Sequence, residues 1–71
     1  MYNLYVNLWN GKRTNPYTMC DKELIYEYAE LIAKNGEDVK SVWIVDGLTG
    51  EILDEYKVEY ERTKVVVKCT K

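Results

Sequence analysis

The sequence contains no histidine, one serine, one proline and only two cysteines among 71 residues. Without histidine the chain lacks the commonest catalytic base. Ser-His-Asp and Cys-His catalytic sites are therefore excluded, and so are histidine-based zinc sites. Cys20 and Cys69 are too few and too far apart for a disulfide framework or a CxxC metal site. We therefore expect no catalytic residue, no metal and no cofactor, and hence no enzymatic activity.

Two groups of residues still carry reactive chemistry, and each has a simpler interpretation. Cys20 precedes a predicted helix, a position that can activate a thiol, but Asp21 and Glu23 beside it oppose this effect. We interpret both cysteines as reduced, partly buried thiols. Five carboxylates lie close together in the sequence: Glu51, Asp54, Glu55, Glu59 and Glu61. Alternation places Glu55, Glu59 and Glu61 with Lys57 on one strand face, which we interpret as a solvated face that also discourages edge pairing.

Long hydrophobic runs and a strong charge of one sign are also missing. No segment approaches the ~20 apolar residues that span a membrane, and the first residues do not resemble a signal peptide. We therefore expect a cytoplasmic protein with no membrane contact. Ten Lys and Arg against twelve Asp and Glu give a net charge of -2. This charge balance argues against nucleic acid as a partner. A chain this short also implies no concave pocket, so no small-molecule substrate is evident.

The N-terminal residues predict a β-hairpin. Residues 2–9, YNLYVNLW, alternate apolar and polar side chains over eight positions, as a half-buried strand does. Asn10-Gly11 favours a type I′ turn, after which residues 12–14 can pair back as a short second strand. Asn15-Pro16 is expected to end that strand, because proline cannot donate to a β-ladder.

Residues 18–36 predict one helix. Thr18 or Asp21 can cap its start, and Asn35-Gly36 supplies a left-handed stop at its end. Apolar side chains recur at helical spacing and predict the buried stripe: Leu24, Ile25, Tyr28, Leu31 and Ile32.

Residues 39–69 predict a three-stranded meander, with strands in 40–46, 51–61 and 65–69. The fold expected is a single α+β domain, residues 1–71, in β(β)αβββ order. One antiparallel sheet of four to five strands carries the helix on one face. The predicted helix-covered face comprises Leu4, Val6, Leu8, Trp43, Val45, Ile52, Tyr56 and Val58. The predicted open face comprises Asn3, Tyr5, Asn7, Trp9, Val42, Ile44, Leu53 and the glutamates.

Residues 45–52, VDGLTGEI, contain the feature that looks most like a binding loop. A phosphate loop would lead into a helix N-terminus, whereas Gly50 leads into an alternating strand. Asp46 and Glu51 alone do not supply the ligands of an EF-hand. We interpret the segment as a four-residue hairpin turn in which Asp46 binds the turn backbone and Gly50 is left-handed. Val45 should then pair with Ile52, and Asp46 with Glu51.

The segment VWIVDGLTGEIL, residues 42–53, resembles a pattern in small uncharacterised proteins of bacteria and their phages. Those proteins consist of a strand, a helix and a hairpin reading roughly V-D-x-x-T-G-E-I/V. The resemblance implies a compact accessory protein that acts by binding. Such a protein is often phage- or prophage-encoded and inhibits or modulates a host protein, including defence systems.

The aromatic composition suggests how binding occurs, because there are seven tyrosines and two tryptophans but no phenylalanine. Tyr and Trp combine an apolar body with a polar tip and suit wet interfaces. The sequence therefore predicts a protein-binding face centred on Tyr5, Trp9 and Arg13, with Asn7 and Lys12. The partner is another protein or a second copy of the chain. The alternatives are a nucleic-acid module that stacks bases on these aromatics and a purely structural homodimer.

Overall fold

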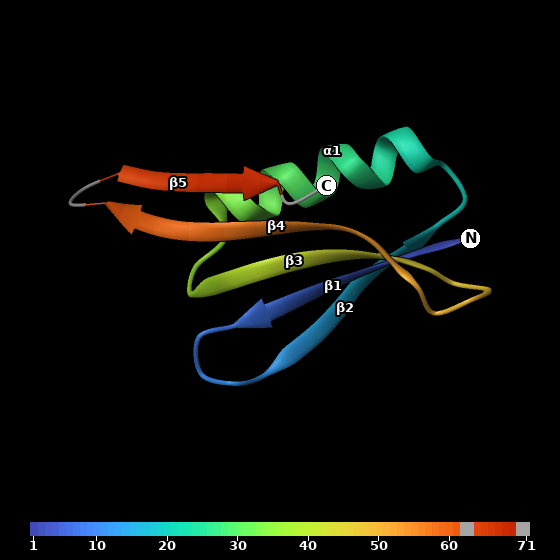
Figure 1. The fold of residues 1–71 in the computed structure, drawn as a ribbon, viewed down its shortest axis with the longest axis horizontal. Coiled ribbons are helices and arrows are strands. Elements are labelled where there is room, and N and C mark those ends of the chain that lie inside the picture. Colours follow the sequence, from blue (N-terminus) through green and yellow to red (C-terminus); the bar gives the residue numbers. More distant parts are fainter. Residues whose placement is uncertain (62–63, 70–71) are drawn as a thin grey trace.

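In the computed structural model, which describes residues 1–61 and 64–69 and the side chains of residues 1–59, a helix packs on an antiparallel sheet (Figure 1). The five strands lie in the order β2-β1-β3-β4-β5. This arrangement confirms the predicted α+β class. The elements are β1 (Tyr2–Leu8), β2 (Arg13–Met19), α1 (Lys22–Asn35), β3 (Val39–Asp46), β4 (Ile52–Glu61) and β5 (Lys64–Cys69).

Four residues, Trp9 to Lys12, connect β1 and β2, and the predicted type I′ turn is wrong. A type I′ turn needs positive φ at both central residues, but only Gly11 has it, at 89°. The Gly11 N–H donates to the Leu8 carbonyl at 3.1 Å, and the Leu8 N–H donates to the Lys12 carbonyl at 2.8 Å. This geometry places Trp9 at the outer end of the hairpin, where it is 55% exposed.

Strand β2 continues through Pro16, so the predicted stop at Asn15-Pro16 is also wrong. Because β2 is an edge strand, the missing N–H of proline breaks no ladder on its outer side. The register shifts here, between the pairs Leu4 with Tyr17 and Val6 with Thr14. With its side-chain amide oriented so that the nitrogen faces the carbonyls of Leu4 and Tyr17, Asn15 can donate to both, at 2.8 and 2.9 Å, and satisfy this irregularity.

Helix α1 begins after Asp21, whose Oδ1 accepts a hydrogen bond from the Leu24 N–H at 3.1 Å. Its buried face is formed by Ile25, Ala29 and Ala33, each at most 1% exposed and spaced at i, i+4, i+8. The predicted stripe is therefore wrong for its two leucines, since Leu24 and Leu31 are 37% and 53% exposed. The two alanines allow the helix backbone to approach the sheet closely, which turns the bulkier leucines outward.

Gly36 ends the helix, but not in the left-handed conformation that was predicted, because its φ is -71°. Its N–H donates to the Ile32 carbonyl at 2.8 Å. A Cβ at this position would lie 2.6 Å from both the Ile32 carbonyl oxygen and the Val39 Cγ2. Glycine is therefore required for close packing of the helix end, and the left-handed residue of this loop is Asp38.

Strand β4 contains one extra residue, Leu53, where it pairs with β3. Val45 pairs with Ile52, as predicted, but Ile44 pairs with Asp54. Because side chains alternate along a strand, one inserted residue changes which positions of β3 and β4 share a face. Leu53, predicted on the open face, consequently packs against the core cluster, and Asp54 is buried at 8% exposure.

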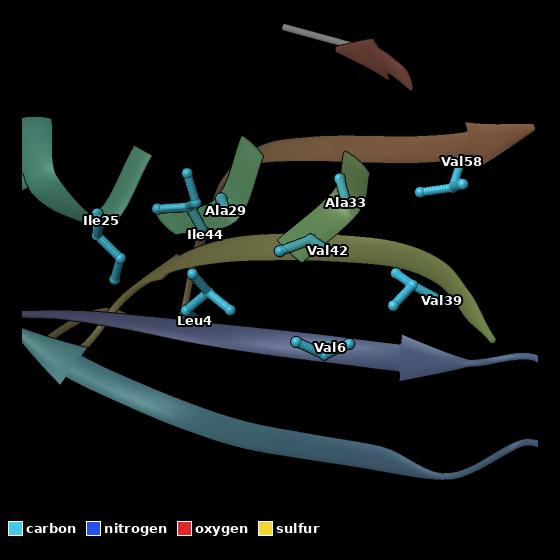
Figure 2. Packing of buried hydrophobic residues seen from close by; sticks show 9 residues of the cluster. All are labelled: Leu4, Val6, Ile25, Ala29, Ala33, Val39, Val42, Ile44 and Val58. Atoms are coloured by element: carbon cyan, nitrogen blue, oxygen red, sulfur yellow. The ribbon is translucent and has the colours of Figure 1, made fainter. Parts of the chain in front are cut away.

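The helix-covered face of β3 is thus the reverse of the prediction. Val42 and Ile44 are fully buried under the helix, whereas Trp43 and Val45 alternate with them toward the other face. Ile52, predicted in the core, is 40% exposed. The predictions hold for β1 and for the later part of β4. Figure 2 shows the resulting core of Leu4, Val6, Ile25, Ala29, Ala33, Val39, Val42, Ile44 and Val58. Leu8 and Tyr56 are partly buried and pack against this core.

The VDGLTGEI segment is a hairpin turn, as predicted. The Asp46 N–H donates to the Glu51 carbonyl at 2.8 Å, and Gly50 has a φ of 75°. Asp46 Oδ1 accepts hydrogen bonds from the Leu48 and Thr49 N–H groups, at 2.8 and 3.3 Å. These two bonds favour the ionised carboxylate and lower the pKa of Asp46 below its ordinary value of 3.8.

We predict that Gly36→Ala destabilises the protein by about 1–3 kcal/mol, because the added methyl group must displace the backbone carbonyl of Ile32 and the side chain of Val39. Urea unfolding followed by circular dichroism measures the loss. Asn35→Ala, one residue away on the exposed helix end, is the matched control and should change stability by less than about 0.5 kcal/mol. Equal stability of the two variants would contradict the close packing at Gly36.

We predict that Asp46→Asn lowers stability at neutral pH and makes the protein less sensitive to acid. The lowered pKa of Asp46 means that its ionised form stabilises the folded state above 3.8 and loses this effect as the pH falls through the folded value. The gap in urea midpoint between wild type and variant should therefore narrow below that pH. A gap independent of pH would show that the carboxylate charge is not involved.

Candidate functional site

The face of the sheet away from α1, here called the open face, carries polar and aromatic side chains in rows across the strands. In one row Tyr5 of β1 lies opposite Trp43 of β3, which lies opposite Glu55 of β4. The next row runs Arg13, Asn7, Ser41 and Lys57. Cross-strand neighbours on one face are close enough to contact each other directly.

Trp43 lies at the centre of the open face and is held from two sides. Its indole Nε1 donates to Glu55 Oε2 at 2.8 Å. The guanidinium carbon of Arg13 lies 4.4 Å from the ring centroid, a cation–π contact. The half-buried indole of β3 therefore has its polar edge engaged by β4 and one ring face engaged by Arg13, which reaches across β1 from β2.

Asn7 joins β2 to β3 through its side-chain amide. Its Nδ2 donates to Ser41 Oγ at 3.0 Å, and its Oδ1 accepts from Arg13 Nε at 2.7 Å. Ser41 is only 7% exposed, and an unpaired hydroxyl in such a buried position would destabilise the fold. The hydrogen bond from Asn7 satisfies this hydroxyl. The side chains of Ser41, Asn7, Arg13 and Trp43 thus form one connected network.

Lys40 reaches this region because β3 contains an extra residue opposite β1. The register changes from Asn7 paired with Ser41 to Leu8 paired with Val39, which leaves Lys40 unpaired between them. Val39 remains in the core at 2% exposure. The ammonium group of Lys40 lies 5.7 Å from the ring centroid of Trp9, so the exposed Trp9 also has a cation beside it.

These side chains border a shallow depression, which we call the basic hollow. Its larger part, about 350 Å³, is lined by residues that include Asn7, Lys12, Arg13, Trp43 and Glu55. An adjoining part of about 260 Å³ is lined by Trp9, Lys57 and Glu59, among others. Lys40, Ser41 and Glu55 border both parts, so the two lie side by side.

The structure brings the predicted site residues together. Tyr5, Asn7 and Arg13 lie on the open face, and Lys12 and Trp9 lie in the turn at its end. Sequence reasoning missed several residues of the hollow: Lys40, Ser41, Trp43 and Lys57. Trp43 was assigned to the core because the Leu53 bulge was not foreseen, and no pattern in the sequence marks Lys40 as an unpaired residue.

Cys20 is exposed and free, so its predicted partial burial is wrong; the side chain of Cys69 lies outside the described residues. Among the described side chains, no group of three His, Cys, Asp or Glu is placed to hold a metal ion. No described helix combines the length and the apolar character needed to cross a membrane.

Comparison of the chain with protein-family models, curated proteins and solved structures finds no match. The resemblance of residues 42–53 to small bacterial and phage proteins therefore stays a prediction. The function must be argued from the open face itself.

We predict that Asn7 and Ser41 are energetically coupled. A double-mutant cycle of Asn7→Ala and Ser41→Ala should give a coupling energy of about 0.5–1.5 kcal/mol, because each variant alone removes the same buried hydrogen bond. Urea unfolding of the four proteins measures this energy. Strictly additive losses would contradict the network.

Proposed function

We propose that this chain is a non-enzymatic domain that binds a partner protein through the open face. The observation that carries the proposal is the arrangement of Trp9, Trp43 and Arg13 around the basic hollow. Tryptophan, tyrosine and arginine are the residue types that most often anchor protein interfaces. Here Arg13, Tyr5 and Trp43 stand on β2, β1 and β3, which lie side by side in that order, and Trp9 lies in the turn between β1 and β2.

These side chains are already held in place by hydrogen bonds and ring contacts, which supports the proposal further. Binding is opposed by the loss of side-chain freedom, and anchors that are already held in place lose less. Arg13 is fixed by Asn7 and by the Trp43 ring, and Trp43 is fixed by Glu55. Trp9 stands at the rim of the hollow and is 55% exposed, so it can contact a partner without rearrangement of the sheet.

Single-stranded nucleic acid is the second candidate, and it is favoured by the cations beside the aromatics. Lys40 lies next to Trp9, and Lys12, Arg13 and Lys57 border the same hollow. Bases stack on aromatic side chains while such cations bind phosphates. Glu55 and Glu59 lie within this surface and repel a phosphate backbone, which places nucleic acid behind protein.

The finer role we propose is that of a cytoplasmic modulator or inhibitor of a host protein, encoded by a phage or prophage. Its support is the resemblance of residues 42–53 described above. The free, exposed thiol of Cys20 also suits a reducing compartment. Self-association through the open face is the remaining alternative.

We predict that Tyr5→Ala with Trp9→Ala abolishes capture of the partner. The intact tagged chain would be used to capture proteins from the organism that encodes it, with quantitative mass spectrometry and with circular dichroism to verify folding. The variant should lose its specific partner, because two aromatic anchors of the open face are removed.

Leu24→Ala with Leu31→Ala is the matched control, because these exposed leucines lie on α1, opposite the open face. This control should retain the partner. Retention by the open-face variant, or equal loss by the control, would overturn the proposal. Light scattering that shows a dimer disrupted only by the open-face variant would favour the homodimer instead.

A further inference from the structure

The guanidinium group of Arg13 is held in a fixed orientation by the protein itself. Its Nε donates to Asn7 Oδ1 at 2.7 Å, and its carbon lies 4.4 Å from the centroid of the Trp43 ring. Asn7 is in turn anchored to the buried Ser41 hydroxyl at 3.0 Å. An arginine oriented in this way forms further hydrogen bonds with little additional loss of freedom.

The donors that remain on Arg13 form a binding fork. A guanidinium group has five N–H donors, and the bond to Asn7 uses the one on Nε. Among the described residues, no carboxylate is paired with Arg13. The four N–H donors on its two terminal nitrogens are therefore available to a ligand. Their planar spacing matches the two oxygens of a carboxylate.

The charge around this fork is positive. Four cations border the basic hollow, namely Lys12, Arg13, Lys40 and Lys57, against the two carboxylates of Glu55 and Glu59. Glu55 is already bonded to the Trp43 indole. By contrast, residues 21–38, which include α1, carry six carboxylates and two lysines. The field therefore attracts an anionic group to the hollow and repels it from the helix side.

The form of the hollow favours a carboxylate-bearing segment over a nucleic acid. Glu55 and Glu59 oppose a continuous run of phosphates, whereas separate carboxylates can be placed next to single cations. Arg13 also covers one face of the Trp43 ring, which removes that face as a platform for a base. A polypeptide can alternate acidic side chains with apolar ones that contact Trp9.

We propose that the open face binds an acidic segment of the partner protein, and that Arg13 receives one of its carboxylates through a two-pronged hydrogen bond. Lys12 and Lys40 attract the neighbouring acidic groups, and Trp9 receives an apolar side chain. This inference rests on the proposed function and specifies the chemistry of the partner.

The test is a titration of the intact ¹⁵N-labelled protein with a capped peptide of alternating glutamate and serine in which one central serine is replaced by leucine. The Arg13 Nε and Trp43 Nε1 signals should shift saturably, and added salt should weaken the binding. The same peptide with glutamine in place of glutamate, and an oligothymidylate of similar length, are the comparison ligands; both should bind more weakly.

Two variants of Arg13 distinguish the contribution of its positive charge from that of its planar pair of N–H donors. Arg13→Gln should weaken binding of the glutamate peptide roughly tenfold, because it removes a charge-assisted pair. Arg13→Lys keeps the charge but loses the planar fork, so it should also bind more weakly than wild type. Lys22→Gln, on α1, removes the same charge from the opposite side and is the matched control, with binding close to wild type.

Each contrary result overturns the inference in a distinct way. Equal binding of the glutamine peptide would exclude carboxylate recognition, and equal losses in Arg13→Gln and Lys22→Gln would exclude the fork. Tighter binding of oligothymidylate would assign the hollow to nucleic acid. The absence of any shift with the glutamate peptide would also overturn it. The proposed function would still stand in that case if the Tyr5 and Trp9 variant loses a captured protein.

Discussion

The register between β3 and β4 is the constraint on which both faces of the sheet depend. Leu53 is inserted in β4 without a partner in β3, so Ile44 pairs with Asp54. Ile44 and Val42 lie under the helix opposite Leu4 and Val6 of β1, and the inserted Leu53 brings Tyr56 of β4 onto this same face while Glu55 joins Trp43 on the open face. The hydrophobic core and the aromatic surface therefore have the same origin. Neither face can be altered at the bulge without altering the other.

The sequence predicted the fold where local patterns are strong. The alternation in residues 2–9 and the helical spacing after Asp21 gave the correct element types and their order. Prediction from the sequence failed where tertiary packing overrides the local pattern of side chains. Leu24 and Leu31 were expected on the buried side of α1, but Ala29 and Ala33 occupy that side together with Ile25. Small residues allow a closer approach, and no periodicity of large side chains reveals this.

The candidate site was predictable in part for the same reason. Tyr5, Asn7 and Arg13 follow from the alternation of β1 and from the hairpin that returns beside it. Trp43 and Lys40 depend on two irregularities of β3 pairing, one against β4 and one against β1. An inserted residue in a strand has no distinctive composition here. That Trp43 and Lys40 belong to the site is therefore evident only from the three-dimensional structure.

The irregular middle of β2 limits how other chains can approach the sheet. Pro16 has no N–H group to donate to a further strand, and the register of β2 shifts at this point. The outer edge of β2 consequently offers an interrupted ladder to any additional strand. Sheet extension and edge-to-edge aggregation are both discouraged at this edge. A partner that approaches this edge cannot bind by pairing its backbone with β2 along a continuous ladder. Its recognition at this edge then depends on which side chains it contacts.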